Sequence, residues 1–307
     1  MPSRPAPPDA VTRAALQRIP AGCAPWGRGW CAAAACILEA AAPKPGNVHP
    51  GAAFPDLDHD DLVAAALAIA PVMERAAAAP LGRTVRESVE ASRRVTRSNA
   101  NLGMVLAIAP LAAIRGDVPP AAGAAAVLAE LGPADAADVW AAIAAARPGG
   151  LGTSERHDVL GPPPADVLAA MRLAAPRDRI AALWAEGYAG LAAGLAAELA
   201  AEIAAHDDIR DAIVRAFLRE LARSPDSLVI RRHGSAVAAD VSTRAAAVLA
   251  AGPGWREAAA AFDRSLRAPV RVNPGTTADL VAAALYILLR DPEHRPALGR
   301  HLEPPPR

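Results

Sequence analysis

The side chains best suited to chemistry gather in a few short polar segments of this 307-residue chain. The first is the loop from Pro43 to Gly51, which places a cation, a carboxamide and an imidazole between prolines and glycines, with Glu39 just before it. Prolines stop a helix, and glycines let the backbone approach a ligand closely. We therefore predict a binding loop here, with a plain proline-rich helix connector as the alternative.

The aspartates that follow this loop have the ligand chemistry of a magnesium site. Mg²⁺ prefers oxygen ligands and usually keeps waters and substrate phosphates. For Asp58, Asp60 and Asp61 the favoured interpretation is capping, because carboxylates stabilise helix N-termini. Asp56 lies earlier in the loop and is the better candidate for a metal ligand.

Three later segments have the composition of anion-binding sites. Residues 99–103 open a predicted helix, whose free N–H groups can take a phosphate, although Asn99 can also serve as a simple cap. Arg231 and Arg232 resemble an anion clamp, with a solvated loop as the alternative. Residues 273–279 open another helix, and their amides and hydroxyls could cradle a phosphate or a ribose.

The elements that must position these segments are predicted to be helices. Alanine, leucine and arginine dominate, aromatic residues make up only 3%, and strand-like alternation is hard to find. We expect an all-α protein, one large multi-helix bundle with the functional loops clustered at one end. The expected helices span residues 30–42, 58–78, 82–95, 102–114, 119–131, 134–146, 166–174, 177–205, 209–223, 236–251, 255–266 and 276–289.

The remaining stretches divide the chain. Residues 1–28 are rich in proline, alanine and arginine and predict a poorly ordered tail, which leaves 29–302 as a single catalytic domain. Residues 147–164 and residues 224–234 are expected to be loops. The first of these contains His157-Asp158, which with Arg177 and Asp178 makes the third of five polar segments in chain order. The segment from Asp226 to Gly234 is then the fourth, and residues 273–279 are the fifth. The helix over 177–205 is expected to break near Gly187 or Gly194.

Bulk properties exclude several classes of function. The formal net charge is +0, which gives no electrostatic case for nucleic acid or an anionic membrane as partner. No apolar run reaches the length of a membrane span, and no signal peptide is evident. Three cysteines without metal-site spacing suggest reduced thiols. A cytoplasmic protein is expected, and a homodimer is left open.

Taken together, the polar segments resemble the signatures of the triphosphoribosyl-dephospho-CoA synthase family. The loop from Pro43 to Gly51, with Glu39 before it and Asp56 after it, resembles the signature loop of that family. Residues 99–103 resemble its second motif, and the segments around Arg231 and over 273–280 resemble its later ones. The resemblance runs in the same order from about Cys31 to Leu289.

This resemblance implies an all-α transferase that uses ATP and 3′-dephospho-CoA. The ribose 2′-hydroxyl of dephospho-CoA attacks C1 of the ATP ribose and adenine leaves, giving the precursor of the prosthetic group of citrate lyase or malonate decarboxylase acyl carrier proteins. Such a reaction needs cations with Mg²⁺ at the triphosphate, a base for the hydroxyl proton, and negative charge near the oxocarbenium-like centre.

The resemblance also suggests roles for individual residues. Lys44, Arg231 and Arg232 suit the triphosphate. Glu39 or Asp56 could act as the base, and Asp56 or Asp279 could hold the metal, with Lys44 counted among the catalytic residues. The expected nucleotide-binding residues are Lys44, Gly46, Asn47, His49, Asn99, Asn101, Gly103, Arg231, Arg232, Asn273, Gly275 and Thr276.

The second motif departs from the family pattern. Citrate lyase members have Asn-Thr-His-Lys-Gly, whereas this chain has Asn101 and Leu102 in place of the histidine and lysine. With the Arg147-Pro148-Gly149-Gly150 loop, this change resembles a divergent branch typical of archaea and one-carbon-metabolising bacteria. A related ATP-dependent transfer to a coenzyme precursor of the methanopterin or methanofuran type is therefore an alternative.

Two other interpretations remain open from the sequence. Three His-Asp dipeptides, which begin at His59, His157 and His206, could belong to a metal phosphohydrolase. The loss of the His-Lys pair also fits a helical binding protein without catalytic activity. Tight binding of Mn²⁺, Fe or Ni would favour the phosphohydrolase. The absence of any thermal shift with nucleotide or Mg²⁺ would favour the binding protein without catalytic activity.

Overall fold

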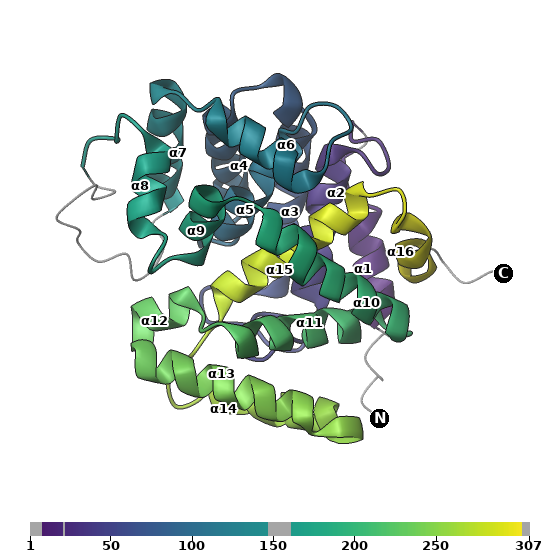
Figure 1. Cartoon of the computed structure of the whole chain (residues 1–307). Coiled ribbons are helices and arrows are strands. Elements are labelled where there is room, and N and C mark those ends of the chain that lie inside the picture. The colour runs from purple at the N-terminus through teal and green to yellow at the C-terminus, as the bar shows by residue number, and fades with distance from the viewer. Residues whose placement is uncertain (1–7, 21, 147–160, 303–307) are drawn as a thin grey trace.

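The computed structural model describes residues 8–20, 22–146 and 161–302, and every regular element in these residues is a helix (Figure 1). The described residues form two isolated β-bridges, His49 with Ala52 and Phe54 with Leu57, and no strand. The expectation of an all-α protein is confirmed. The elements are α1 (Pro8–Leu16), α2 (Arg28–Ala41), α3 (His59–Glu74), η1 (Ala76–Ala78), α4 (Leu81–Val95), α5 (Leu102–Ala112), α6 (Pro120–Ala129), α7 (Pro133–Ala146), α8 (Val167–Ala174), α9 (Arg179–Glu186), η2 (Leu191–Ala196), α10 (Ala197–Ala205), α11 (Ile209–Arg223), α12 (Ser227–His233), α13 (Ser235–Ala250), η3 (Gly252–Gly254), α14 (Trp255–Arg267), α15 (Gly275–Arg290) and α16 (Arg295–Leu302).

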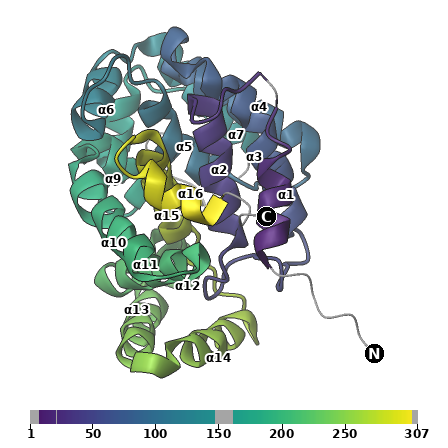
Figure 2. The same ribbon diagram turned by 90° about the vertical axis from the view of Figure 1, so that its right-hand side faces the viewer.

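Helix α15 forms the centre of the molecule, as both views show (Figures 1 and 2). Its residues from Leu280 to Leu289 are all buried, and it contacts α2, α5, α10, α11 and α12. A helix that is apolar on all sides must be surrounded by other helices, which explains why this segment is central. Its N-terminal turn carries the polar residues of the last predicted motif.

The alanine-rich sequence allows the helices to approach one another closely. A Cβ atom on Gly29 would lie 2.1 Å from the backbone oxygen of Ala70, so α2 and α3 touch backbone to backbone there. A Cβ atom on Gly82 would lie 2.4 Å from Cα of Asp135, which gives α4 and α7 the same kind of contact. At these two contacts the missing side chain lets the helix backbones come together.

Aspartates begin several of these helices. Asp58 accepts a hydrogen bond from the backbone N–H of Asp61, whose side chain accepts one from the backbone N–H of Asp58, so the two form a capping box at α3. The capping interpretation of this aspartate group is confirmed. Asp166, Asp178, Asp208 and Asp226 begin later helices, and each side chain accepts hydrogen bonds from backbone N–H groups of the first turn.

Two expectations about local structure need correction, and a third is confirmed. Residues 224–234, expected as a loop, contain the short helix α12 between its cap Asp226 and Gly234, where φ is 89°. The expected tail contains α1, whose Ala15 and Leu16 are buried. The break expected near Gly187 or Gly194 in the helix over 177–205 is confirmed at Gly187, where φ is 90°, and the two parts are bent by 108° relative to each other. Most of the loop expected over 147–164, with His157 and Asp158, lies outside the described residues.

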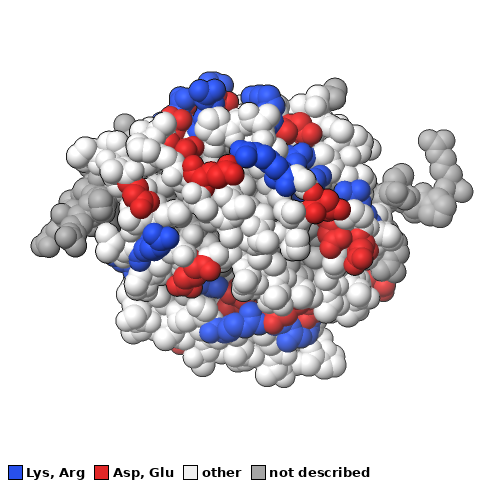
Figure 3. Space-filling model, turned by 45° about the horizontal axis from the view of Figure 1, so that its top comes forward, with Lys and Arg blue, Asp and Glu red and all other residues white. Residues whose placement is uncertain are grey.

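Basic and acidic side chains are interspersed on the face seen in Figure 3, and neither sign forms a continuous field there. This mixture agrees with a formal net charge of +0. Among the described helices, no single one has the length and apolar composition to cross a membrane. One bent pair, Arg179–Glu186 with Leu191–Ala205, reaches that length and composition only when its two helices are counted together.

Candidate active site

The loop after α2 and the segment before α15 lie against each other. The side-chain amide of Asn47 donates a hydrogen bond to Oδ1 of Asn273 at 2.5 Å, although the two are 226 residues apart in sequence. The backbone N–H of Gly46 donates to Oδ1 of Asp263 at 2.8 Å, and Arg267 donates to the carbonyl of Asn47. Gly46 has a φ of 81°, and a Cβ atom on it would lie 2.7 Å from the carbonyl oxygen of Val272. Only glycine fits at this junction between the first and last motifs.

Lys44 and Glu39 form a buried ion pair beneath this loop. Their side chains are 0% and 3% exposed, and Nζ of Lys44 lies 2.8 Å from Oε1 of Glu39. The same ammonium donates to the carbonyl oxygens of Glu39 and of Ala42, the latter at 3.1 Å. An ammonium has three donors, and all three are therefore used inside the protein. Burial raises the pKa of Glu39, and the charge of Lys44 opposes that rise.

The second motif is pressed against the last one at Gly103. A Cβ atom on Gly103 would lie 1.9 Å from Oδ2 of Asp279, so α5 and α15 leave room for the carboxylate only because this residue is glycine. Burial raises the pKa of Asp279 well above its ordinary value, and the nearby carboxylates of Glu39 and Asp226 add to the effect. Within the described residues no hydrogen bond or ion pair satisfies Asp279. Its carboxyl therefore favours the neutral form until a cation comes close to it.

Asp226 ties the fourth segment to the fifth. Its Oδ1 accepts from the N–H groups of Leu228 and Val229, and its Oδ2 accepts from both the N–H and the hydroxyl of Thr277, at 2.7 and 2.8 Å. One buried carboxylate therefore caps α12 and α15 together. The hydroxyl of Thr276 accepts from that of Ser227 at 3.1 Å. The predicted cradle at the start of α15 is thus largely occupied by the protein's own groups.

A group of three arginines, which we call the arginine cluster, lies at the more exposed side of the site. It consists of Arg231 and Arg232 on α12 and Arg271 in the segment before α15. Arg231 pairs with Asp178 at 3.0 Å, and Arg271 pairs with Asp56 at 2.8 Å. The pKa of Arg232 is lowered first by burial and then by the charges of Arg271 and Arg231.

Several buried polar atoms in this region have no hydrogen-bond partner among the described residues. These atoms are Oδ1 of Asn47, Nδ2 of Asn101, Nε2 of His59, Nε of Arg231 and Nη1 of Arg267. Oδ1 of Asn101 accepts from the hydroxyl of Ser92 at 2.8 Å, so this amide is oriented. Buried polar groups are nearly always paired, and unpaired ones grouped at one place indicate a site for a polar ligand.

The three remaining predicted residues have simple local roles. The backbone N–H of Gly275 donates to the carbonyl of Asn273 at 2.8 Å, and a Cβ atom on Gly275 would lie 2.9 Å from Cδ2 of Leu228. Oδ1 of Asn99 accepts from the N–H of Leu102 at 3.1 Å, which is the capping alternative. Nδ1 of His49 accepts from the N–H of Gly51 at 3.1 Å, so the neutral ring carries its proton on Nε2. Burial lowers the pKa of His49 to about 4 and keeps the ring neutral near pH 7.

The structure thus brings together predicted residues from the first, second, fourth and fifth segments, and it joins Asp178 of the third to Arg231. Asp56 lies with the arginine cluster, whereas Asp279 lies at the buried end near Glu39. Sequence reasoning missed several residues that hold the site, namely Ser92, Asp263, Arg267 and Arg271. Only Arg271 had a signal, its place two residues before Asn273.

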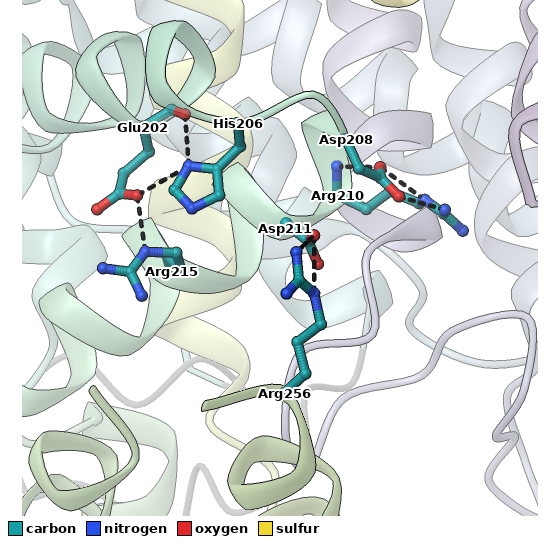
Figure 4. Close-up of polar contacts among 7 residues, drawn as sticks. All are labelled: Glu202, His206, Asp208, Arg210, Asp211, Arg215 and Arg256. Atoms are coloured by element: carbon teal, nitrogen blue, oxygen red, sulfur yellow. Dashed lines mark hydrogen bonds and ion pairs between the residues drawn. The ribbon is translucent and has the colours of Figure 1, made fainter. Parts of the chain in front are cut away.

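Metal-binding groups of the phosphohydrolase type are not found in the described part of the chain, where no group of three or more His, Cys, Asp or Glu side chains could hold an ion. His206 instead lies against Glu202, with Nδ1 2.9 Å from its backbone oxygen and 3.4 Å from its carboxylate, and Arg215 binds the same carboxylate (Figure 4). This arrangement is a structural ion-pair network that joins α10 to α11.

Comparison with known families decides the class. The model of the ATP:dephospho-CoA triphosphoribosyl transferase family, CitG, matches residues 25–296. The chain belongs to this family. Among curated proteins none matches. A crystal structure from Archaeoglobus fulgidus, provisionally named a triphosphoribosyl-dephospho-CoA synthase, superposes with a TM-score of 0.56 at 22% identity, and the match covers 73% of this chain and 96% of that one.

The solved structure supports the fold, and the family match supports the chemistry. A CitG-family chain is a transferase that uses ATP, which argues against the phosphohydrolase and non-catalytic alternatives. The match also spans all the segments that meet at the candidate site, from Glu39 to Asp279. The family assignment and the geometry therefore point to the same part of the molecule.

Proposed function

We propose that the protein transfers the triphosphoribosyl group of ATP to the 2′-hydroxyl of 3′-dephospho-CoA with release of adenine. The observation that carries this proposal is the convergence of the first, second and later motifs on one site. That site has a buried acidic end, formed by Glu39 and Asp279, and a basic end, formed by the arginine cluster. The substrates and reaction centre have the complementary arrangement, a triphosphate at one end and a developing positive charge at the other.

The arginine cluster supplies the cations for the triphosphate. Arg231 is held by Asp178 at 3.0 Å, which fixes the guanidinium on α12. Arg232 adds a second guanidinium next to it, and guanidinium groups bind phosphate oxygens in pairs of hydrogen bonds. Lys44, by contrast, has no donor left for a phosphate, and its proposed role is to orient and balance Glu39.

Glu39 is the proposed base for the 2′-hydroxyl. Burial raises its pKa, which makes the ionised carboxylate a stronger base, and the ion pair with Lys44 keeps it ionised and fixed in position. Asp56 is the poorer candidate, because its pKa is lowered, chiefly by the hydrogen bond from Arg271. The negative charge of Glu39 in this buried position also favours an oxocarbenium-like centre.

Asp279 is the proposed protein ligand of Mg²⁺. Magnesium sites in nucleotide-using enzymes commonly take one or two carboxylates together with substrate phosphates, so a single unsatisfied carboxylate fits the ion. When bound, Mg²⁺ would neutralise charge on the triphosphate. The protein's own contribution is to hold Asp279 in place with Gly103 and α15.

The test is to incubate the purified protein with Mg·ATP and dephospho-CoA and to follow adenine by chromatography. Adenine that appears only when both substrates are present would support the proposal. A matched pair of variants, Glu39→Gln and Glu202→Gln, separates catalysis from stability, because Glu202 is also a buried carboxylate with cationic partners but lies outside the site. Equal loss of turnover in both variants would contradict the assignment of Glu39.

A second candidate is transfer to a coenzyme precursor of the methanopterin or methanofuran type. The observation that favours it is the second motif, where Leu102 is buried and Asn101 is held by Ser92. Neither residue supplies a cation, so an acceptor with fewer phosphates than dephospho-CoA is accommodated. A clear thermal shift with Mg·ATP, without adenine release in the presence of dephospho-CoA, would support this candidate over the first.

A further inference from the structure

The ion pair between Arg271 and Asp56 has features that a purely structural contact does not need. Its side chains are 34% and 63% exposed, and an ion pair this exposed adds little to folding stability. The guanidinium of Arg271 lies 4.5 Å from the ring centroid of Phe54, and that of Arg267 lies 5.7 Å from the same ring. Stacking on Phe54 holds Arg271 in a fixed orientation independently of Asp56.

The charges around this pair do not balance. The arginine cluster has three guanidinium groups, and the carboxylates that pair with it are Asp178 and Asp56. Within the described residues, Arg232 has neither a hydrogen bond nor an ion pair. Guanidinium groups remain charged at any physiological pH, so the cluster keeps a positive excess.

We propose that Arg271 is a third triphosphate-binding residue and that Asp56 competes with the triphosphate for it. This inference rests on the proposed function, since it assigns the oligophosphate to ATP. Carboxylate and phosphate oxygens use the same donors of a guanidinium, so a phosphate oxygen takes the position on Arg271 that Asp56 holds. Phe54 keeps the guanidinium in place during the exchange. Asp56 then belongs to the binding site as a competing anion rather than as a base or metal ligand.

The proposal predicts effects of opposite sign from the two partners of one ion pair. Arg271→Gln removes a charged donor and weakens binding of the anion. Asp56→Asn removes the competitor and a negative charge while keeping the shape of the side chain, and it strengthens binding. A structural ion pair would give no change in anion affinity from either variant, or a loss of stability and affinity from both.

The experiment titrates inorganic triphosphate into the full-length protein in a calorimeter, without Mg²⁺ and at fixed ionic strength. The matched control is Arg244→Gln, because Arg244 also stacks on a phenylalanine, Phe262 at 4.8 Å, and pairs with an aspartate, Asp240 at 3.5 Å, on α13. We expect Arg271→Gln to raise Kd about ten-fold, Asp56→Asn to lower it several-fold, and the control to leave it unchanged. Circular dichroism confirms that each variant is folded.

Two outcomes would overturn the inference. One is that Arg271→Gln and Asp56→Asn change Kd in the same direction, or no more than the control does. The other is that triphosphate competes with dephospho-CoA and not with ATP in the adenine-release assay. The proposed function can fail separately. If triphosphate binds and the variants change Kd as expected, but no adenine is released, the anion site stands and the proposed reaction is refuted.

Discussion

The buried pair of Lys44 and Glu39 gives a sharp test of the electrostatics inferred for the site. Lys44→Met removes the ammonium but keeps most of its apolar length. The carboxylate of Glu39, 3% exposed, then has no counter-charge at 2.8 Å. Breaking a buried ion pair by removing one partner typically costs about 3–5 kcal/mol, because the remaining charge stays buried without compensation.

The size of this effect depends on pH in a defined direction. Burial raises the pKa of Glu39, and Lys44 opposes the rise, so the variant has a still higher folded-state pKa. A carboxyl with a raised folded-state pKa contributes stability that is present below its unfolded value, about 4.3, and is lost as the pH rises through the folded value. The variant is therefore closest to the wild type at acidic pH and weakest at neutral and alkaline pH.

Urea unfolding of the wild type and of Lys44→Met at about pH 5 and about pH 8 measures this difference. The double variant Glu39→Gln with Lys44→Met is the control, because it removes both charges and should recover most of the loss at about pH 8. Equal unfolding midpoints of the wild type and Lys44→Met at both pH values would mean that Lys44 does not compensate Glu39 in solution.

Three further predictions concern other parts of the site. Gly103→Ala places a Cβ atom 1.9 Å from Oδ2 of Asp279, and we expect it to lower turnover at least about ten-fold and stability by about 1–3 kcal/mol. The control Gly190→Ala has no atom within 4 Å of its Cβ, and it should change the free energies of activation and of unfolding by less than about 1 kcal/mol. Comparable effects from the two variants in the adenine assay would contradict the contact. The pKa of His49 is lowered to about 4, so its ring does not titrate between about pH 5.5 and 8. The pH profile of kcat/KM in that range should therefore keep its shape in His49→Gln. If the variant lost an inflection there, the wild-type ring would titrate in that range. Asp226→Asn places an amide among four donors and should destabilise the protein by about 2–3 kcal/mol in urea, and a variant as stable as wild type would show that the double cap is not formed.

Much of the helical fold could be predicted from the sequence because the boundaries carry strong local signals. Asp58 with Asp61 predicted the start of α3, and Gly187 predicted the break after α9. Helix α12 was missed although Asp226 and Gly234 mark its ends, since seven residues are too few to show a helical period. The local sequence was therefore sufficient to predict an element where that element is long or has a standard cap.

The loops that form the site could be predicted from the sequence, but the roles of their individual residues could not. Proline and glycine marked the first and last motifs, whose contact through Asn47 and Asn273 depends on the tertiary fold. A lysine in a glycine-bearing loop suggests a phosphate contact, yet Lys44 is 0% exposed and uses its donors internally. Burial is a property of the whole packing arrangement, and no feature of the loop sequence reports it.

The two ends of the site differ in the freedom of their charged groups, and this difference suits the two tasks of the reaction. At the buried end, Lys44 fixes Glu39 at 2.8 Å and Gly103 confines Asp279, so both carboxyl groups are already in position and need no reorganisation. At the basic end, Arg271 pairs with a carboxylate that is 63% exposed, so its partner can be exchanged at low cost. Rigid charge is most effective where bonds change, because it stabilises the transition state without rearrangement, whereas exchangeable charge is most effective where a substrate must enter and its product must leave.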